Sequence, residues 1–424
     1  MTELRSGTRP GVGLISVGWM GKLHTKAYQA VPLTYPELGV APRLVAAADT
    51  EPSRAQYAVD VLGYATGTTD YREVLANPEV DVVSICAPNF LHAEMGVAAA
   101  EAGKHFWIEK PVGRGHEEAQ AVARAADAAG VVTSVGFNYR HAPAVEHMRE
   151  LVAGGRLGRI TNVRCVFFAG YSADPRGALS WRFQRAYAGS GVLGDLGSHA
   201  VDLCTYLVGP VTDVTALTST VHTRRPILPM GSGTHFAVIE GGEQADVENE
   251  DYVAALLRFG GSGPGAGAVG TIESSRVAVG PDCRYGIEVY GTEGSVSWDF
   301  ERLNELKVFS GRGASELGYV TVNANPSYGD FARFQPGAGC SMGFDDLKTI
   351  EAKKFLAAVA GIAYDNSTIA DAVASAAFVT AAEDSAASGQ WVALPSIPGA
   401  TAAGSAPAAG LPGTDGAPDP VTVG

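Results

Sequence analysis

Along the first 137 residues, short apolar runs alternate with amphipathic stretches, as expected for parallel strands separated by helices. The run at 80–87 is almost continuously apolar, which is typical of a strand covered on both faces. The pattern predicts a doubly wound α/β domain over residues 1–137. Its expected strands are 11–17, 43–48, 80–87, 105–108 and 131–137, and its expected helices are 20–30, 52–62, 92–102 and 117–129.

Beyond residue 138 the apolar runs become longer and few helical stretches separate them. The sequence Gly-Thr-Glu-Gly at 291–294 is a hairpin signal between two of these runs. We therefore expect a second α/β domain over 138–394 with a large, open, mostly antiparallel sheet. The expected strands are 160–168, 211–221, 253–259, 269–275, 285–290 and 295–298, the expected helices are 147–153, 345–360 and 371–387, and the expected loops are 238–250 and 260–268.

The last residues, 395–424, consist largely of Ala, Gly, Pro and Thr without any periodicity. Such a segment buries too little apolar surface to offset the entropy lost on ordering. We expect it to be a disordered tail.

Composition and charge narrow the classes of function. The chain of 424 residues has a formal net charge of -14, which excludes an extended nucleic-acid-binding surface. It has no apolar run long enough for a membrane span and no signal-peptide core near its first residue. Its five cysteines are scattered, without the spacing of a disulfide framework or a zinc site. We expect a cytoplasmic protein that acts on a small molecule and uses no metal.

The segment from Ser16 to Gly21 follows the first expected strand and opens the first expected helix. In this context Gly18 allows the backbone to approach a pyrophosphate, and Gly21 allows close packing of the helix. The helix N-terminus adds free N–H groups and a positive dipole. The pattern predicts a Rossmann domain that binds a dinucleotide through Ser16, Gly18, Trp19, Met20 and Gly21. Ser16 stands where the first glycine of this fingerprint usually lies, and an ordinary glycine-containing turn is the alternative.

Asp49 closes the second expected strand. A carboxylate at this position accepts hydrogen bonds from the adenosine ribose and repels a 2′-phosphate. This favours NAD over NADP. Arg54 could instead reach a 2′-phosphate, although an ordinary solvated helix residue also explains it.

Two further motifs follow the next strands of the first domain. Pro88 and Asn89, with His92, follow the strand at 80–87, and Glu109-Lys110-Pro111 follows the strand at 105–108. Ligands of open α/β sheets bind at these carboxyl ends. Together with the run from Gly194 to His199, these motifs resemble the glucose-fructose oxidoreductase and inositol dehydrogenase (Gfo/Idh/MocA) family over residues 11–395. Within that family the chain is most similar to the levoglucosan dehydrogenase branch, through the segments 137–140, 172–175, 179–184 and 188–191.

The resemblance implies a bound nicotinamide cofactor, a pyranose-like substrate and a homodimer or homotetramer. It implies that Lys110, Asp195 and His199 are catalytic. The cofactor contacts that it implies are Gly18, Trp19, Met20, Asp49, Pro88, Asn89, His92, Glu109 and Lys110, with Trp181 and Arg182 in addition.

The chemistry of an alcohol oxidation suits these residue types. Histidine is a natural base for the hydroxyl proton, so we assign His199 this role. Asp195 lies one helical turn before His199, where its carboxylate could orient the ring or bind the sugar. Lys110 would stabilise the developing alkoxide, although a desolvated lysine could instead be the base. A structural histidine satisfied by Asp195 or Asp202 is the competing interpretation, and Asp202 itself fits either a site role or helix support.

Several polar and aromatic residues could line the sugar site, because aromatic faces stack on pyranoses and Arg or Gln binds hydroxyls. Packing at the domain junction would explain them equally well. These candidates are Tyr139, Arg140, Trp181, Arg182 and Gln184. The acidic group Asp246, Glu248, Glu250 and Asp251 lacks the pattern of a calcium loop, so we interpret it as solvated.

Three functions are compatible with these residues. The first is an NAD-dependent dehydrogenase for a ring hydroxyl of a sugar, anhydrosugar or cyclitol. The second is a glycosidase that recycles NAD through oxidation, elimination, hydration and reduction, possibly on an anionic sugar such as a sulfoquinovoside. The third is a non-catalytic NAD sensor, which the presence of both Lys110 and His199 disfavours.

Overall fold

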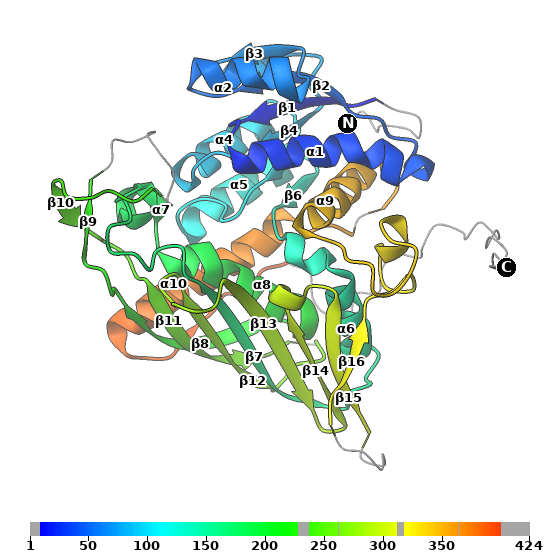
Figure 1. The fold of residues 1–424 in the computed structure, drawn as a ribbon, viewed down its shortest axis with the longest axis vertical. Coiled ribbons are helices and arrows are strands. Elements are labelled where there is room, and N and C mark those ends of the chain that lie inside the picture. Colours follow the sequence, from blue (N-terminus) through cyan, green and yellow to red (C-terminus); the bar gives the residue numbers. More distant parts are fainter. Residues whose placement is uncertain (1–8, 228–236, 262, 312–317, 364, 400–424) are drawn as a thin grey trace.

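A computed structural model of the chain describes residues 9–227, 237–261, 263–311, 318–363 and 365–399. Figure 1 shows a helix-covered parallel sheet in its upper part and a broad open sheet in its lower part. This arrangement confirms the predicted fold class of a Rossmann domain joined to a second α/β domain. The domain boundaries themselves stay a prediction.

The first sheet has six parallel strands in the order β3-β2-β1-β4-β5-β6. The strands are β1 (Gly11–Ile15), β2 (Arg43–Ala48), β3 (Thr66–Thr68), β4 (Val82–Ile85), β5 (His105–Ile108) and β6 (Thr133–Val135). The helices are α1 (Trp19–Thr34), α2 (Pro52–Tyr57), α3 (Tyr71–Ala76), α4 (Asn89–Glu101) and α5 (His116–Ala129), with short turns η1 (Pro36–Leu38) and η2 (Ala58–Leu62). The sequence did not predict β3 or α3, because β3 is a short Thr-Gly-Thr segment at the sheet edge with no apolar side chain.

The second sheet has nine strands in the order β16-β15-β14-β13-β7-β12-β11-β8-β17. Only the β7–β12 pair is parallel among these neighbours, so the sheet is mostly antiparallel as predicted. Its strands are β7 (Ile160–Ala169), β8 (Val211–Ser219), β11 (Tyr252–Phe259), β12 (Val269–Ser275), β13 (Cys283–Gly291), β14 (Gly294–Asp299), β15 (Glu305–Ser310), β16 (Val320–Asn323) and β17 (Val392–Ala393). The strands β15, β16 and β17 were not predicted.

A separate ribbon pairs β9 (Arg224–Pro226) with β10 (Gln244–Asp246). The strand β10 lies inside the segment 238–250 that was predicted as a loop, and a strand of three residues carries too little pattern to be recognised. The predicted tail lies outside the described residues from position 400 onward.

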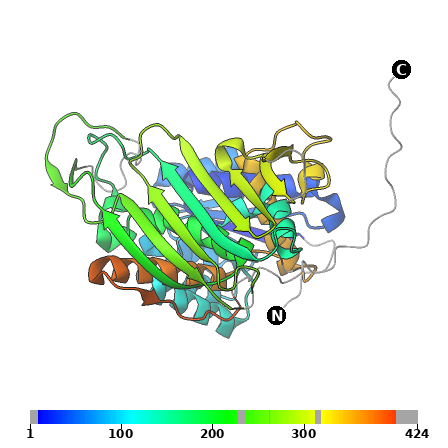
Figure 2. The ribbon, with the colours of Figure 1, turned by 90° about the horizontal axis from the view of Figure 1, so that it is seen from below.

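Helices cover one face of the nine-stranded sheet and leave the other open (Figure 2). The remaining helices are α6 (Pro143–Ala153), α7 (Arg185–Ala188), α8 (Ser198–Val208), α9 (Phe344–Val359) and α10 (Ile369–Ser388), and the shorter turns are η3 (Asn138–His141), η4 (Trp181–Phe183), η5 (Leu193–Gly197), η6 (Phe300–Arg302) and η7 (Phe331–Arg333). Two helices late in the chain return to the first domain, since α9 packs on α1 and α10 packs on α5. The site described next lies where these elements meet.

Candidate active site

The turn between β1 and α1 has the geometry of a dinucleotide-binding turn. Ser16 has φ 75°, and it is the only non-glycine residue of the described chain with a positive φ. It therefore adopts the left-handed conformation in which glycine is usual. A Cβ at Gly21 would lie 2.2 Å from the Ser16 carbonyl oxygen, so only glycine allows α1 to begin against this turn. The tight turn forms even though a serine replaces the first glycine.

The start of α1 offers its N–H groups to an anion. Gly18 is the N-cap residue, no side chain caps the helix, and its first turn holds no acidic residue. Unpaired N–H groups and the positive dipole end then favour a pyrophosphate. Asp49 adjoins this turn, because its Oδ2 accepts a hydrogen bond of 2.8 Å from the Val17 amide. These residues fit a dinucleotide.

Trp19 lies at the rim of the site. Its side chain is 69% exposed and its ring stacks on Phe344 at the start of α9, with 5.9 Å between centroids. Phe344 in turn lies 5.9 Å from the ring of Tyr139. A row of aromatic rings therefore joins the cofactor turn to the second domain.

The ends of β4 and β5 lie side by side, because these strands pair in parallel. Pro88 and Asn89 begin α4, and His92 follows one turn later. The Nδ1 of His92 donates a 2.7 Å hydrogen bond to the carbonyl oxygen of Pro111. This bond ties α4 to the turn that carries Lys110.

The Lys110 side chain reaches the Asp195 turn of the second domain. Its Nζ lies 2.7 Å from the Asp195 carbonyl oxygen and 3.2 Å from Asp195 Oδ1. The Tyr171 hydroxyl donates to the other carboxylate oxygen of Asp195 at 2.5 Å. Sequence reasoning missed Tyr171, since it follows β7 without any motif and its partner is 24 residues away.

Asp195 and His199 lie one turn apart on a continuous helical segment, as the spacing predicted. Asp195 belongs to the π-helical turn η5, and His199 follows in the first turn of α8. Such π turns are often found at functional sites. The arrangement places His199 directly beyond the residue that binds Lys110.

His199 is buried in an aromatic surround. Its ring packs edge-on against Tyr139 at 4.9 Å and against Phe137 at 5.9 Å. Burial, and next the nearby Lys110 ammonium, lower the pKa of His199 well below its ordinary value. The imidazole is therefore neutral at neutral pH and can accept a proton.

Glu109 points away from the Lys110 side of the turn into a buried ionic cluster. Its Oε1 lies 2.9 Å from His24 Nε2 and 2.6 Å from Lys348 Nζ. Burial alone would raise the pKa of Glu109, but Lys348 and His24 outweigh burial and hold it below its ordinary range. Burial in turn lowers the pKa of His24 to about 4. Glu109, assigned to cofactor binding from the sequence, is thus paired with His24 on α1 and Lys348 on α9.

Arg140 is buried between Asp202 and Asp371, whereas the sequence predicted it at the wall of a sugar site. Its side chain is 3% exposed, its Nε lies 2.8 Å from Asp202 Oδ2, and its NH2 binds Asp202 Oδ1 and lies 3.2 Å from Asp371 Oδ1. The guanidinium is therefore paired with two carboxylates inside the protein, and its contact with a sugar stays a prediction. The same pairing settles the open question on Asp202, which supports the helix packing.

The other predicted wall residues keep a place near the site. Tyr139 packs beneath His199, as described above. Trp181, Arg182 and Gln184 are partly exposed on the loop between β7 and η5. The Arg182 guanidinium lies 4.3 Å from the Trp181 ring, and that ring contacts Phe90 beside Asn89.

The acidic group at 246–251 is only partly solvated, which corrects the interpretation from the sequence. Asp246 and Glu248 are exposed. Glu250 is buried and accepts hydrogen bonds from the amides of Gly191 and Leu193, and Asp251 is buried against Arg276.

Within the described ranges, no three His, Cys, Asp or Glu side chains are grouped so as to hold a metal ion. No helix in the same ranges is long and apolar enough to cross a bilayer.

Comparison with known proteins identifies the family. Residues 11–137 match the oxidoreductase family with an NAD-binding Rossmann fold, and residues 145–297 match the GFO/IDH/MocA C-terminal domain. The chain belongs to the Gfo/Idh/MocA oxidoreductase family. As a member of it, the chain has an NAD-binding Rossmann domain, and its cofactor is NAD.

Several Gfo/Idh/MocA relatives are dehydrogenases of sugars and cyclitols. Levoglucosan dehydrogenase of Pseudarthrobacter phenanthrenivorans is 38% identical over 91% of this chain and 98% of its own length. The scyllo-inositol 2-dehydrogenase (NAD(+)) of Bacillus subtilis is 28% identical over 64% of this chain and 71% of its own length. A structure of levoglucosan dehydrogenase in complex with NADH and L-sorbose has a TM-score of 0.85 at 36% identity, covering 92% of this chain and 100% of that one.

Proposed function

We propose that this chain is an NAD-dependent dehydrogenase that oxidises a ring hydroxyl of a sugar, anhydrosugar or cyclitol. One observation carries the proposal. The Lys110 ammonium, held on Asp195, and the neutral imidazole of His199 belong to the same small site beside the cofactor turn. Similar structures of levoglucosan dehydrogenase, in complexes with NADH and L-sorbose or levoglucosan, support a site for NAD and a sugar.

The residues divide the work of an alcohol oxidation. NAD, when bound, accepts the hydride from the carbon that carries the hydroxyl. The neutral His199 takes the hydroxyl proton. Two contacts hold Lys110 on Asp195 and leave one N–H of its ammonium for the substrate oxygen, where it stabilises the developing alkoxide charge.

The rim of the site suits a sugar ring. Trp181 supplies partly exposed aromatic surface for the C–H face of a pyranose, and Gln184 supplies an amide for its hydroxyls, while the buried Tyr139 supports His199 from beneath. Asp49 favours NAD over NADP, because a buried carboxylate beside the Val17 amide repels a 2′-phosphate. The proposal includes a cytoplasmic location, which the five free cysteines support, and a homodimer or homotetramer.

An assay with purified protein tests the proposal. The protein is mixed with NAD or NADP and a panel of sugars, anhydrosugars, cyclitols and aryl glycosides, and both NADH formation and aglycone release are followed. We expect stoichiometric NADH from at least one unsubstituted sugar or cyclitol, with NAD preferred. Aglycone release without net NADH would point to the NAD-recycling glycosidase, and NAD binding without any turnover would point to a sensor.

A further inference from the structure

The loop of residues 170–192, between β7 and η5, lies beside the site and also contacts the Rossmann domain through Trp181 and Phe90. It carries Tyr171, whose hydroxyl binds Asp195, and apart from isolated bridges its regular structure is limited to the short turns η4 and α7. An irregular segment lacks the hydrogen-bond ladder of a strand, so its backbone carbonyls need partners elsewhere. The positions of those partners decide where Tyr171 lies.

Two buried arginines enclose one ring of this loop. Phe183 is 1% exposed, and the guanidinium carbons of Arg225 and Arg276 lie 4.4 Å and 4.5 Å from its centroid. Both arginine side chains are almost completely buried. A buried guanidinium destabilises the fold unless its donors are satisfied, so the acceptors of these two groups are informative.

Arg225 binds the beginning of the loop, immediately after Tyr171. Its NH2 donates to the carbonyl oxygen of Ser172 at 2.5 Å, and its NH1 donates to the carbonyl oxygens of Asp174 at 2.9 Å and Gly177 at 3.3 Å. One rigid guanidinium thus fixes three backbone positions of the loop.

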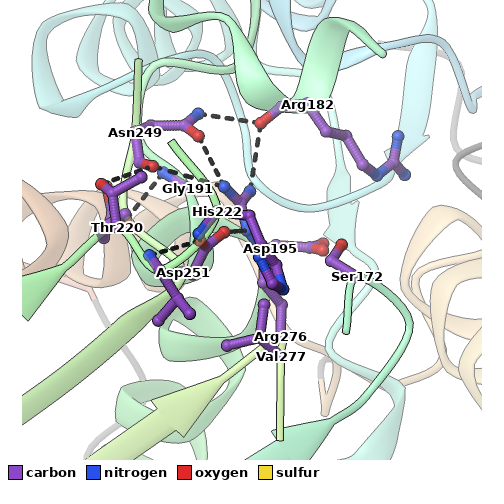
Figure 3. A network of polar contacts seen from close by, with 12 residues as sticks. Ser172, Arg182, Gly191, Asp195, Thr220, His222, Asn249, Asp251, Arg276 and Val277 are labelled. Carbon is purple, nitrogen blue, oxygen red and sulfur yellow. Dashed lines mark hydrogen bonds and ion pairs between the residues drawn. The ribbon is translucent and has the colours of Figure 1, made fainter. Parts of the chain in front are cut away.

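Arg276 binds the loop further along. Its NH1 donates to the carbonyl oxygen of Arg182, and its NH2 donates to Asn249 Oδ1 at 2.8 Å. Its Nε pairs with Asp251, while its own carbonyl oxygen accepts the Ser172 amide at 2.9 Å. Figure 3 shows the joined contacts of Arg276, Asn249 and Arg182, from which the Arg182 side chain leads away.

The end of the loop is held from the same direction. Asn249 Nδ2 donates to the carbonyl oxygen of Ser190, and the Glu250 carboxylate accepts the amides of Gly191 and Leu193. These contacts lead directly into the turn η5 that carries Asp195. The beginning, the middle and the end of the loop are therefore held by the side chains of Arg225, Arg276, Asn249 and Glu250.

We propose that Arg225 and Arg276 are positioning residues, which shape residues 170–192 through their backbone carbonyls so that the Tyr171 hydroxyl holds Asp195 beside Lys110. The kinetic consequence rests on the proposed dehydrogenase function, whereas the effect on the loop does not. Lysine cannot replace either arginine, because a single ammonium cannot span several carbonyls and stack on a ring.

A double-mutant cycle tests the kinetic consequence, with the full-length protein and the sugar that the wild type oxidises best. We expect Tyr171→Phe and Arg225→Lys each to lower kcat/KM for the sugar by about tenfold, the effect of one lost hydrogen bond to a charged group. NADH affinity, followed by fluorescence titration, stays unchanged. We expect the kcat/KM of the double variant to equal that of the less active single variant, because both changes disturb the same contact. Losses that multiply would overturn the proposal.

Hydrogen exchange tests the loop without any substrate. Arg225→Lys should speed amide exchange within residues 170–178, whereas the matched change Lys354→Gln, which removes a buried cation bound to Glu146 on α6, should leave that segment unchanged. If the amides of residues 170–178 exchange in the Arg225→Lys variant at the same rate as in the wild type, the positioning role is refuted. If that variant does not fold, Arg276→Lys replaces it, with exchange followed over residues 170–185. A wild type that oxidises no sugar, together with faster loop exchange in the variant, would contradict only the dehydrogenase proposal.

Discussion

At the scale of single residues, the site separates a charged pair from a neutral base. Lys110 and Asp195 bind each other directly, while His199 lies one turn away among aromatic rings. An ammonium close to an imidazole makes protonation of that imidazole costly, as burial does. The lysine that we propose to stabilise an alkoxide therefore also helps to keep His199 neutral, the form in which a base acts, while making it a weaker base.

This electrostatic arrangement predicts the pH dependence of the reaction. A base works in its neutral form, and a pKa lowered well below 6.5 keeps His199 neutral when the solution is acidified through that value. We expect initial-rate kcat/KM to stay level as the pH falls through 6.5 and to decline only in more acidic solution. His199→Ala should lose about 100-fold or more of kcat with unchanged NADH affinity. If kcat/KM falls with a midpoint at pH 6.5, or if His199→Ala keeps nearly full activity, His199 is not the base.

The structure brings together Lys110, Asp195 and His199, which the sequence singled out in motifs, whereas nothing in the sequence indicated the residues that reach the site through distant partners. Lys110 and His199 stand at strand and helix ends whose place follows from chain order alone. Tyr171 and Arg225 reach the site through a loop whose conformation depends on the finished second sheet. Arg140 looked like a ligand residue because a sequence does not show which carboxylates will face it.

At the scale of elements, the β1–α1 turn has the shape of the fingerprint without its usual first glycine. Ser16 accepts a left-handed backbone, in which a Cβ is unfavourable by about 1 kcal/mol. The fold tolerates this strain because the Ser16 amide still binds the Ala48 carbonyl oxygen at 2.8 Å. For predicting a dinucleotide-binding turn, the exact residues of the motif are thus less informative than its position between a strand and a helix.

Ser16→Gly should stabilise the protein, since glycine adopts positive φ without strain. We expect a gain of about 1 kcal/mol in unfolding free energy, or an increase in Tm of about 1 °C for a chain of this length. Ser16→Ala serves as the control, because it keeps the Cβ and should bring no gain. Calorimetry measures both variants. A less stable Ser16→Gly protein would show that the serine hydroxyl supports the turn.

The long elements were predictable and the short ones were not. Strands such as β7 and β11 show alternating apolar positions over many residues, which a sequence displays plainly. The strands β15 and β16 lie at the sheet edge, where β16 is largely exposed and its alternation is weak. Edge strands obtain their conformation from the neighbour that they pair with, so their own residues reveal little.

At the scale of the whole molecule, the chain crosses between its two sheets more than once. The helix α9 packs on α1, and Lys348 on α9 reaches Glu109, which precedes Lys110. The helix α10 likewise packs on α5 of the first domain. Helices that follow the second sheet in the chain therefore pack on the first domain beside the site. A simple division of the chain at residue 137 does not describe these contacts.

The open face of the nine-stranded sheet is the surface through which we expect subunits of the proposed homo-oligomer to associate. Leu217 on β8, Leu256 on β11 and Val269 on β12 are each more than half exposed on that face, at 58%, 52% and 55%. Figure 2 shows no helix in front of these strands. Contiguous exposed apolar side chains on a broad surface mark an association site. A second copy of the chain, packed face to face, would bury them.

A charge on this face should therefore weaken the association of subunits. For Leu256→Asp we expect a lower mass in light scattering than for the wild type at the same concentration, because symmetry would bury the new carboxylate on both sides of the interface. Leu33→Asp is the matched control, since Leu33 is 86% exposed on α1, a helix of the Rossmann domain and not part of the open sheet. Both variants should keep the wild-type circular dichroism. A monomeric wild type, or an unchanged mass for Leu256→Asp, would mean that the open sheet does not join subunits through this patch.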